Sequence, residues 1–175
     1  MFQAGDTVFY GGSGVCRIDG VISREFGDEM RDYYVLTPVH SQSSTVYLPV
    51  DNNNLVSRMR EVLSKEEIYQ LIHMLPAGKD LWIENENLRK TEFQRILRDG
   101  NQREISALVR TIYQRQQLLA SCGRKLRQSD ERMFKEAQRM FCDEVAFVLD
   151  MPTQKVTQFV GDELEKDAQE KRANA

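Results

Sequence analysis

The first fifty residues alternate between apolar, β-branched or aromatic positions and polar ones in short stretches. Five such stretches are present, at 6–10, 14–18, 21–24, 33–37 and 45–49. Residues typical of turns separate them, at 11–14, 19–20, 27–28 and 40–44. We expect five short antiparallel strands in a small SH3/Tudor-like β-barrel, because closure of the sheet leaves no exposed edge.

From residue 64 onward, apolar residues recur every three or four positions, which is typical of helices. Ser64 and Glu67 have the spacing of a capping box, and Pro76 with Gly78 ends the helix that this box opens. Further helices are predicted over about 81–98, 102–121, 129–148 (from a Ser129-Asp130 cap) and, more briefly, around 156–160. The residues after 160 lack an apolar face, so their end should be frayed.

Together these patterns predict an α+β protein of two domains. The β-barrel should occupy residues 1–55, and a connecting helix and linker residues 56–78. An all-α domain of about four to five helices should fill residues 79–165, followed by a frayed acidic tail at 166–175.

The net charge of −3 is unevenly distributed along the chain. Residues 1–75 hold 6 Lys/Arg against 10 Asp/Glu, whereas residues 76–160 hold 15 against 12. A mildly basic middle beside acidic ends suggests two surfaces with different partners.

The remaining composition argues against several classes of protein. No apolar run approaches the roughly 20 residues that span a bilayer, and no secretory leader is visible, so no membrane role is expected. The three cysteines are far apart in the sequence, which indicates a reducing cytosol: Cys16, Cys122 and Cys142. The two histidines, His40 and His73, are also far apart, so no zinc site is expected. No catalytic pattern stands out, so neither a cofactor nor an enzymatic activity is expected.

The stretch KDLWIENENLRK, residues 79–90, carries the single tryptophan of the chain among charged neighbours. Helical phase places Trp82 on the same arc as Phe93 and Ile96, which favours a core residue. Its position at a predicted helix start, with Arg89 and Lys90 two turns on, would also suit a ring presented to a partner. Both interpretations remain open on the pattern alone.

Several motifs occur in an order that resembles a known family. They are FQAGDTVFYGGSGVCRI, RDYYVL and TVYLPVDN, then WIENENLRKTEFQRILRDGN and SDERMFKEAQRMFCDEVAFVL. Over roughly residues 2–160 the chain resembles the CarD/CdnL family of bacterial transcription regulators. Its N-terminal part is similar to the polymerase-interacting domain of transcription-repair coupling factors.

The resemblance implies a protein that binds the RNA polymerase β subunit and promoter DNA together. In the family, the barrel docks on the β subunit, and the helical domain contacts the upstream edge of the transcription bubble. A tryptophan there wedges into the minor groove and slows bubble collapse. The protein should be a cytoplasmic monomer, associated with the nucleoid through polymerase, and its DNA contact should be largely independent of sequence.

Carried over residue by residue, the resemblance assigns polymerase binding to Arg24, Phe26 and Tyr47. Tyr47 departs from the arginine that other members have on this strand, so it cannot pair bidentately with a carboxylate. DNA binding is assigned to Trp82 as the wedge and to a set of basic residues: Arg89, Lys90, Arg124, Lys125 and Arg132. Glu84 and Glu86 stand where some relatives have basic residues, which should weaken the DNA contact.

A second function remains open beside this one. The protein could be an interaction adaptor whose helical domain binds another protein and never DNA. The modest basicity of the helical part, and the two glutamates beside Trp82, motivate this alternative.

Overall fold

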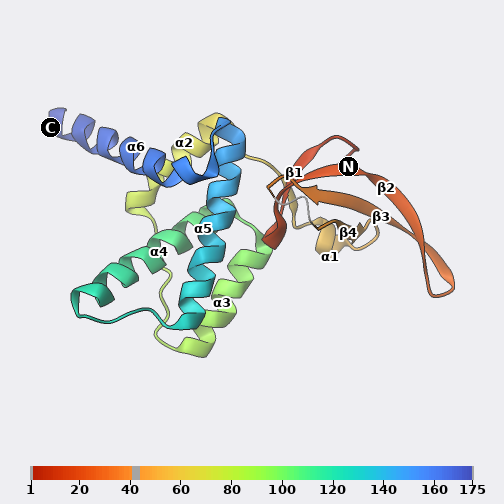
Figure 1. Ribbon diagram of the computed structural model, residues 1–175, viewed down its shortest axis with the longest axis horizontal. Helices are drawn as coiled ribbons and strands as arrows, with labels where there is room; N and C mark the ends of the chain where they lie inside the picture. The colour runs from red at the N-terminus through yellow and green to blue at the C-terminus, as the bar shows by residue number, and fades with distance from the viewer. Residues whose placement is uncertain (1, 41–43, 175) are drawn as a thin grey trace. The chain divides into compact units, whose positions relative to one another are not determined.

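The computed structural model describes residues 2–40 and 44–174, which form two compact units (Figure 1). The first comprises Met1–Val62 with Arg98–Gly100, and the second Leu63–Leu97 with Asn101–Ala175. A five-stranded antiparallel sheet lies in the first unit and a set of helices in the second, so the predicted α+β class is confirmed. The turn expected at 40–44 falls partly outside the described residues.

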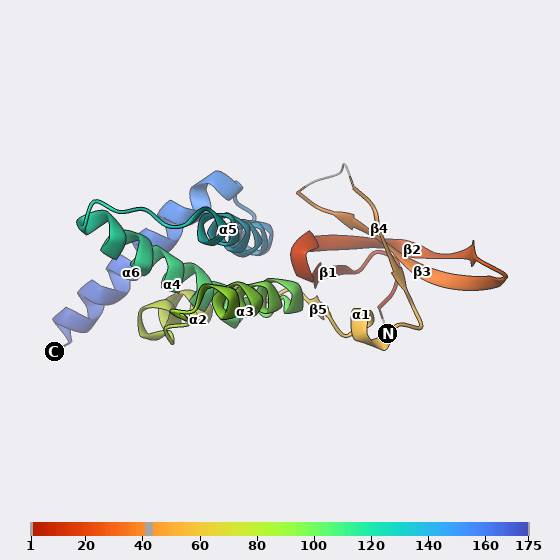
Figure 2. The same ribbon diagram turned by 90° about the horizontal axis from the view of Figure 1, so that it is seen from below.

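The sheet has the strand order β4-β3-β2-β1-β5, with every neighbouring pair antiparallel. In Figures 1 and 2 the β2–β3 hairpin extends well beyond the shorter strands. A four-residue helix, α1 (Asn53–Val56), precedes the last strand. The strands are β1 (Thr7–Tyr10), β2 (Gly14–Phe26), β3 (Glu29–Pro38), β4 (Val46–Pro49) and β5 (Met59–Glu61).

The turn predicted at 19–20 is instead a bulge inside one long strand, β2. The register with β3 shifts between Ile18 and Gly20. Asp19 accepts hydrogen bonds from the Thr37 hydroxyl at 2.5 Å and from Arg17 Nε at 2.8 Å, which lower the pKa of its carboxyl group. The two short strands predicted here are therefore one. The fifth strand is β5, whose three residues are too few to show a pattern of alternation.

The core of the sheet comes from residues that alternate along its strands. Val8, Cys16, Ile18 and Leu36 are fully buried. Because alternate residues of a strand point to opposite faces, the same strands send their polar residues to solvent.

In the described residues, the helical unit contains five long helices and a short 3-10 turn, η2 (Leu75–Ala77). The capping box of Ser64 and Glu67 is confirmed at the start of α2, with both of its hydrogen bonds present. Helix α5 packs against α4, α6 and α2. The helices are α2 (Lys65–Met74), α3 (Glu86–Asp99), α4 (Gln102–Ser121), α5 (Gln128–Leu149) and α6 (Thr153–Ala173).

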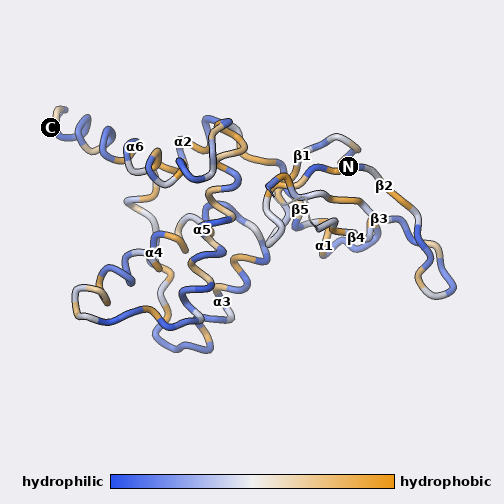
Figure 3. The backbone as a smooth tube through the Cα atoms, in the orientation of Figure 1, coloured by the Kyte–Doolittle hydropathy of each residue, from blue (hydrophilic) through white to orange (hydrophobic). Residues whose placement is uncertain are grey.

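Helix α6 continues to Ala173, so the frayed end predicted after residue 160 is wrong. Its last turns carry mainly hydrophilic residues (Figure 3). Two ion pairs stabilise these turns, each between residues one helical turn apart: Lys166–Glu163 and Lys171–Asp167, both at 2.7 Å. Such pairs stabilise helices that have little apolar surface to bury. The imidazole of His73 on α2 also approaches Asp167, at 3.4 Å.

Two predicted helix starts are also wrong. Helix α3 begins at Glu86 and not near 81, because the Asn85 side chain accepts a hydrogen bond from Leu88 N at 3.1 Å and caps the helix there. Helix α5 begins at Gln128, and no side chain caps it. The side chain of Asp130, predicted as part of that cap, instead accepts hydrogen bonds from Arg89. Trp82 therefore lies before α3, in a segment without regular secondary structure.

Candidate protein and nucleic-acid interfaces

Arg24 and Tyr47 meet on the surface of the sheet. The Arg24 guanidinium carbon lies 4.0 Å from the centroid of the Tyr47 ring. They belong to strands β2 and β4, which flank β3. Both side chains are exposed, Tyr47 by 41%. A cation–π contact of this kind contributes only about 0.5–1 kcal/mol at an exposed site, so both groups remain accessible to a partner.

Phe26 shares this surface. Residues two apart on a strand point to the same face, so Arg24 and Phe26 lie on one side of β2. Phe26 is 63% exposed, and the Arg31 guanidinium carbon lies 5.3 Å from its ring centroid. We call Arg24, Phe26 and Tyr47 the hairpin patch. The structure thus brings the three predicted polymerase-binding residues to one face of the sheet.

Trp82 in the helical unit is half-buried and surrounded by one ring and two guanidinium groups. Its ring packs edge-to-face on Phe93, with centroids 6.4 Å apart, although Trp82 lies outside the helix whose phase suggested a core position. The guanidinium carbons of Arg89 and Arg115 lie 4.2 Å and 4.7 Å from its centroid. The indole Nε1 is buried and has no hydrogen-bond partner among the described residues. The exposed part of this residue is therefore not its N–H group.

Arg89 is 3% exposed, so its prediction as a phosphate contact is wrong. Its Nε and Nη2 donate to the two carboxylate oxygens of Asp130 at 2.9 Å and 2.8 Å. These hydrogen bonds raise the pKa of Arg89. A buried arginine needs such a partner, because an unpaired charge in the interior is strongly unfavourable. Arg89 lies four residues before the buried Phe93 and therefore on the inward face of α3, whereas the next residue, Lys90, is exposed.

The two glutamates beside Trp82 are both paired. Glu84 accepts from Arg115 Nη2 at 3.3 Å, and Glu86 accepts a short hydrogen bond from Arg127. Arg115 was missed by the sequence interpretation. It lies four residues after the buried Thr111 on α4, a spacing that would have placed it on the inner side of that helix.

A cavity of about 180 Å³ lies beside Trp82. Of the predicted DNA-binding residues, Arg124 and Lys125 line it and are exposed, whereas Lys90 and Arg132 are exposed but are not among its lining residues. Its lining is formed by Trp82, Glu84, Glu86, Arg89, Arg115, Leu119, Arg124, Lys125, Leu126, Arg127 and Asp130. The charges of Arg89 and Asp130 compensate each other. The other charged groups of the lining are four basic side chains and two carboxylates, so the net charge of the lining is positive.

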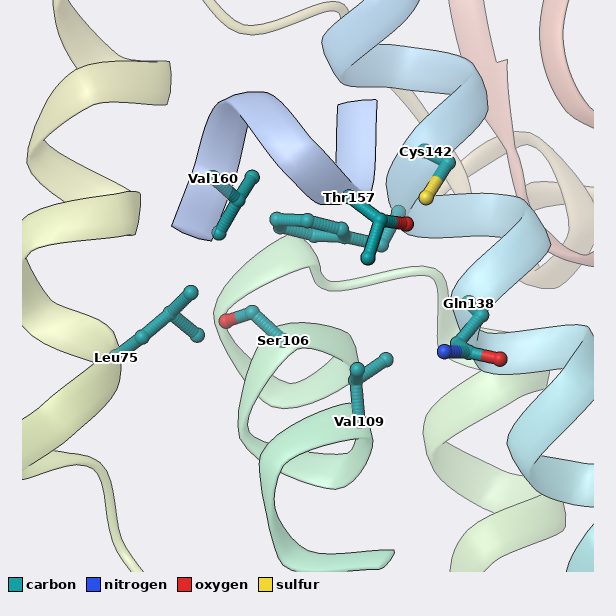
Figure 4. Close-up of a pocket in the computed structure, with 8 residues that line it drawn as sticks. Leu75, Ser106, Val109, Gln138, Cys142, Thr157 and Val160 are labelled. Carbon is teal, nitrogen blue, oxygen red and sulfur yellow. The ribbon is translucent and has the colours of Figure 1, made fainter. Parts of the chain in front are cut away.

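A second cavity, of about 100 Å³, lies among η2, α4, α5 and α6 (Figure 4). Leu75, Val109 and Val160 give it a mainly apolar lining. Burial raises the pKa of the Cys142 thiol at its edge, and a hydrogen bond with Thr157 partly offsets this effect. A raised pKa leaves less thiolate, which does not suit a nucleophile.

In the described parts of the chain, no three His, Cys, Asp or Glu side chains are grouped as metal ligands would be. Nor does any described helix have the length and apolar character needed to cross a bilayer.

Comparison with known families covers most of both units. Residues 2–62 match the family model described as CarD-like/TRCF RID domain, and residues 70–161 match the one described as CarD, C-terminal domain. The chain belongs to the CarD family. The resemblance seen in the sequence motifs is thereby confirmed, and with it an RNA-polymerase-interacting class of transcription regulator.

The two candidate surfaces fall in different CarD family domains. The hairpin patch lies inside the match to the CarD-like/TRCF RID domain, the domain associated with RNA polymerase interaction. Trp82 and every residue that lines its cavity lie inside the match to the CarD C-terminal domain. The chain therefore carries one candidate surface in the domain associated with RNA polymerase interaction and a second in the CarD C-terminal domain.

Proposed function

We propose that this protein docks on the β subunit of RNA polymerase through the hairpin patch and contacts promoter DNA through the region of Trp82. By touching DNA at the upstream edge of the bubble, it changes the stability of the open complex. It acts without catalysis, in the cytoplasm where its polymerase partner is found. Family membership and the geometry of the two surfaces support this proposal.

The single observation that carries the DNA contact is the setting of Trp82. A half-buried indole, whose N–H group is enclosed, stands beside the exposed basic residues Arg124 and Lys125. Apolar wedging between base steps costs a few kcal/mol of unstacking, and less where the duplex is already distorted. Basic side chains around the ring would bind phosphates and orient the protein without reading sequence.

The hairpin patch supports docking on a protein. Arginine and aromatic residues are enriched at the energetic centres of interfaces, and this patch offers one arginine with two exposed rings. Docking also raises the effective concentration of DNA near Trp82, so weak intrinsic DNA affinity is sufficient.

The decisive experiment is replacement of Trp82 by alanine, followed by measurement of open-complex lifetime with polymerase on a linear promoter. We expect dissociation several-fold faster than with the unaltered protein, while polymerase binding persists. Tyr113→Ala is the matched control, because Tyr113 is an exposed aromatic residue of the same unit, 52% accessible. Trp82→Phe keeps a ring against Phe93 and covers the case in which the alanine variant folds poorly. An unchanged lifetime with intact polymerase binding would refute the DNA contact.

The adaptor function is the alternative, and Glu84 and Glu86 favour it because they place negative charge beside Trp82. In that case Trp82→Ala leaves open-complex lifetime unchanged. Binding of a protein partner to the helical domain is lost instead. Cross-linking from position 125 then distinguishes the two functions, since it labels DNA in one and protein in the other.

A further inference from the structure

The segment that carries Trp82 has no secondary structure of its own, so side-chain contacts must set its conformation. It connects η2 with α3. Two hydrogen bonds from its backbone contribute, because Leu81 N donates to Thr111 Oγ1 and Trp82 N to Asp80 Oδ1, both at 3.0 Å. Neither of them touches the indole ring.

Arg89 contacts both the ring and the backbone that follows it. Its guanidinium lies against the indole with its carbon 4.2 Å from the ring centroid. Its Nη1 donates to the carbonyl oxygens of Ile83 at 2.8 Å and of Glu84 at 3.3 Å. One planar group therefore holds the face of the ring and the next two peptide units.

Asp130 fixes the orientation of that planar group. Both carboxylate oxygens accept from Arg89, which defines the plane of the guanidinium as a single hydrogen bond would not. Asp130 is itself only 4% exposed and stands on another helix, α5. The donors of Arg89 are directed to Asp130 and to these two carbonyl groups, and the side chain is enclosed. Direct contact with a phosphate is thus not its role.

We propose that Arg89 and Asp130 are positioning residues, which hold the Trp82 indole in the orientation that meets DNA. This inference rests on the proposed DNA contact of Trp82. A ring held before binding loses less conformational freedom when it binds, and preorganisation of this kind increases affinity without adding a contact. A change that weakens the ion pair of Arg89 and Asp130 should therefore lower DNA affinity, although it removes no side chain that is proposed to contact DNA.

Asp130→Asn is the first test, because asparagine keeps the shape but loses the charge and one acceptor oxygen. Arg89→Lys is the second; it keeps the charge but loses the planar fork. Trp82 is the only tryptophan of the chain, so its fluorescence reports on this site alone. We expect acrylamide quenching and the mobility seen by anisotropy to rise in both variants. With polymerase, we expect open-complex lifetime to fall several-fold, toward that of Trp82→Ala.

A double-mutant cycle separates positioning from a general loss of stability. Added to Trp82→Ala, the Asp130→Asn change should have no further effect on lifetime, because the group that it positions is gone. Asp143→Asn is the matched control: Asp143 is also buried on α5 and paired with an arginine, Arg139 at 3.0 Å. At equal thermal destabilisation, Asp143→Asn should leave both Trp82 quenching and lifetime unchanged.

Two outcomes would overturn the positioning role. One is unchanged quenching of Trp82 in folded Asp130→Asn and Arg89→Lys proteins. The other is an additive loss of lifetime in the double variant. If Trp82→Ala alone leaves the lifetime unchanged, the proposed function fails. The quenching measurement on the free protein still decides whether the ion pair holds the ring.

Discussion

At the scale of single residues, pairing decides what each charge near Trp82 can do. Arg89 looked like a phosphate ligand because it follows Trp82 by two turns, yet it is buried on Asp130. Glu84 and Glu86 looked like an obstacle to DNA, yet each accepts from an arginine. In the structure, these glutamates pair with Arg115 and Arg127, and so keep the two guanidinium groups from binding phosphate.

Replacing both glutamates by glutamine should therefore increase DNA affinity. Each change removes one negative charge and releases one guanidinium for phosphate. We expect a gain of about threefold per residue, the order of an exposed charge pair. Fluorescence anisotropy with a bubble-containing duplex at low salt would measure it. Glu131→Gln is the control, since Glu131 is an exposed glutamate of α5 outside the cavity lining. A lower affinity would show that the glutamates instead support the site.

At the scale of elements, the β2–β3 hairpin and its neighbour β4 build the hairpin patch. Strand alternation places Arg24 and Phe26 on one face, although the strand expected from the sequence ended at residue 24 and β2 continues to Phe26. The contact of Arg24 with Tyr47 depends on strand order, because the two residues lie on strands that flank β3. Strand order is a long-range property that short patterns do not encode.

Reversal of charge at Arg24 should abolish docking on polymerase. Arg24→Glu removes the cation of the patch and places a like charge opposite any acidic partner surface, which costs several kcal/mol in an interface. Co-purification with core polymerase measures the effect. Arg17→Glu lies on the same strand, with a side chain that is 62% exposed, and should leave binding intact. Equal binding by both variants would remove the hairpin patch from the docking surface.

At the scale of the whole molecule, charge is unequally distributed along the chain, with an excess of acidic residues over 1–75 and of basic residues over 76–160. The acidic first part carries the hairpin patch, and the basic middle carries the cavity beside Trp82. The overall net charge of −3 conceals this difference, which becomes visible only when the chain is divided.

The DNA complex should depend steeply on salt, because phosphate contacts release counterions. Neutralising Arg124 and Lys125 together should reduce the slope of log K against log salt by roughly 1.8, about 0.9 for each contact. Lys65 and Lys155, exposed on α2 and α6, provide the control pair. A slope that stays the same in the Arg124/Lys125 variant would place the phosphate contacts elsewhere.

Local pattern predicted the class of fold, the capping box at Ser64 and the helix over 102–121. It misplaced the start of α3, since Asn85 caps more strongly than the apolar spacing before it suggests. It could not predict the pairing of Arg89 with Asp130, because 41 residues separate them in the chain. For the same reason the sequence alone could not decide between a core and a presented position for Trp82.

The distance in sequence between Arg89 and Asp130 also affects how the protein is made. During translation, Trp82 and Arg89 leave the ribosome well before Asp130 does. Until the start of α5 has been synthesised, the Arg89 guanidinium lacks its Asp130 carboxylate, and the indole lacks the support that this ion pair gives. A nascent chain stalled before residue 130 should therefore show a mobile, strongly quenched tryptophan. The surface proposed to face DNA would mature late, after completion of the sheet that is proposed to dock on polymerase.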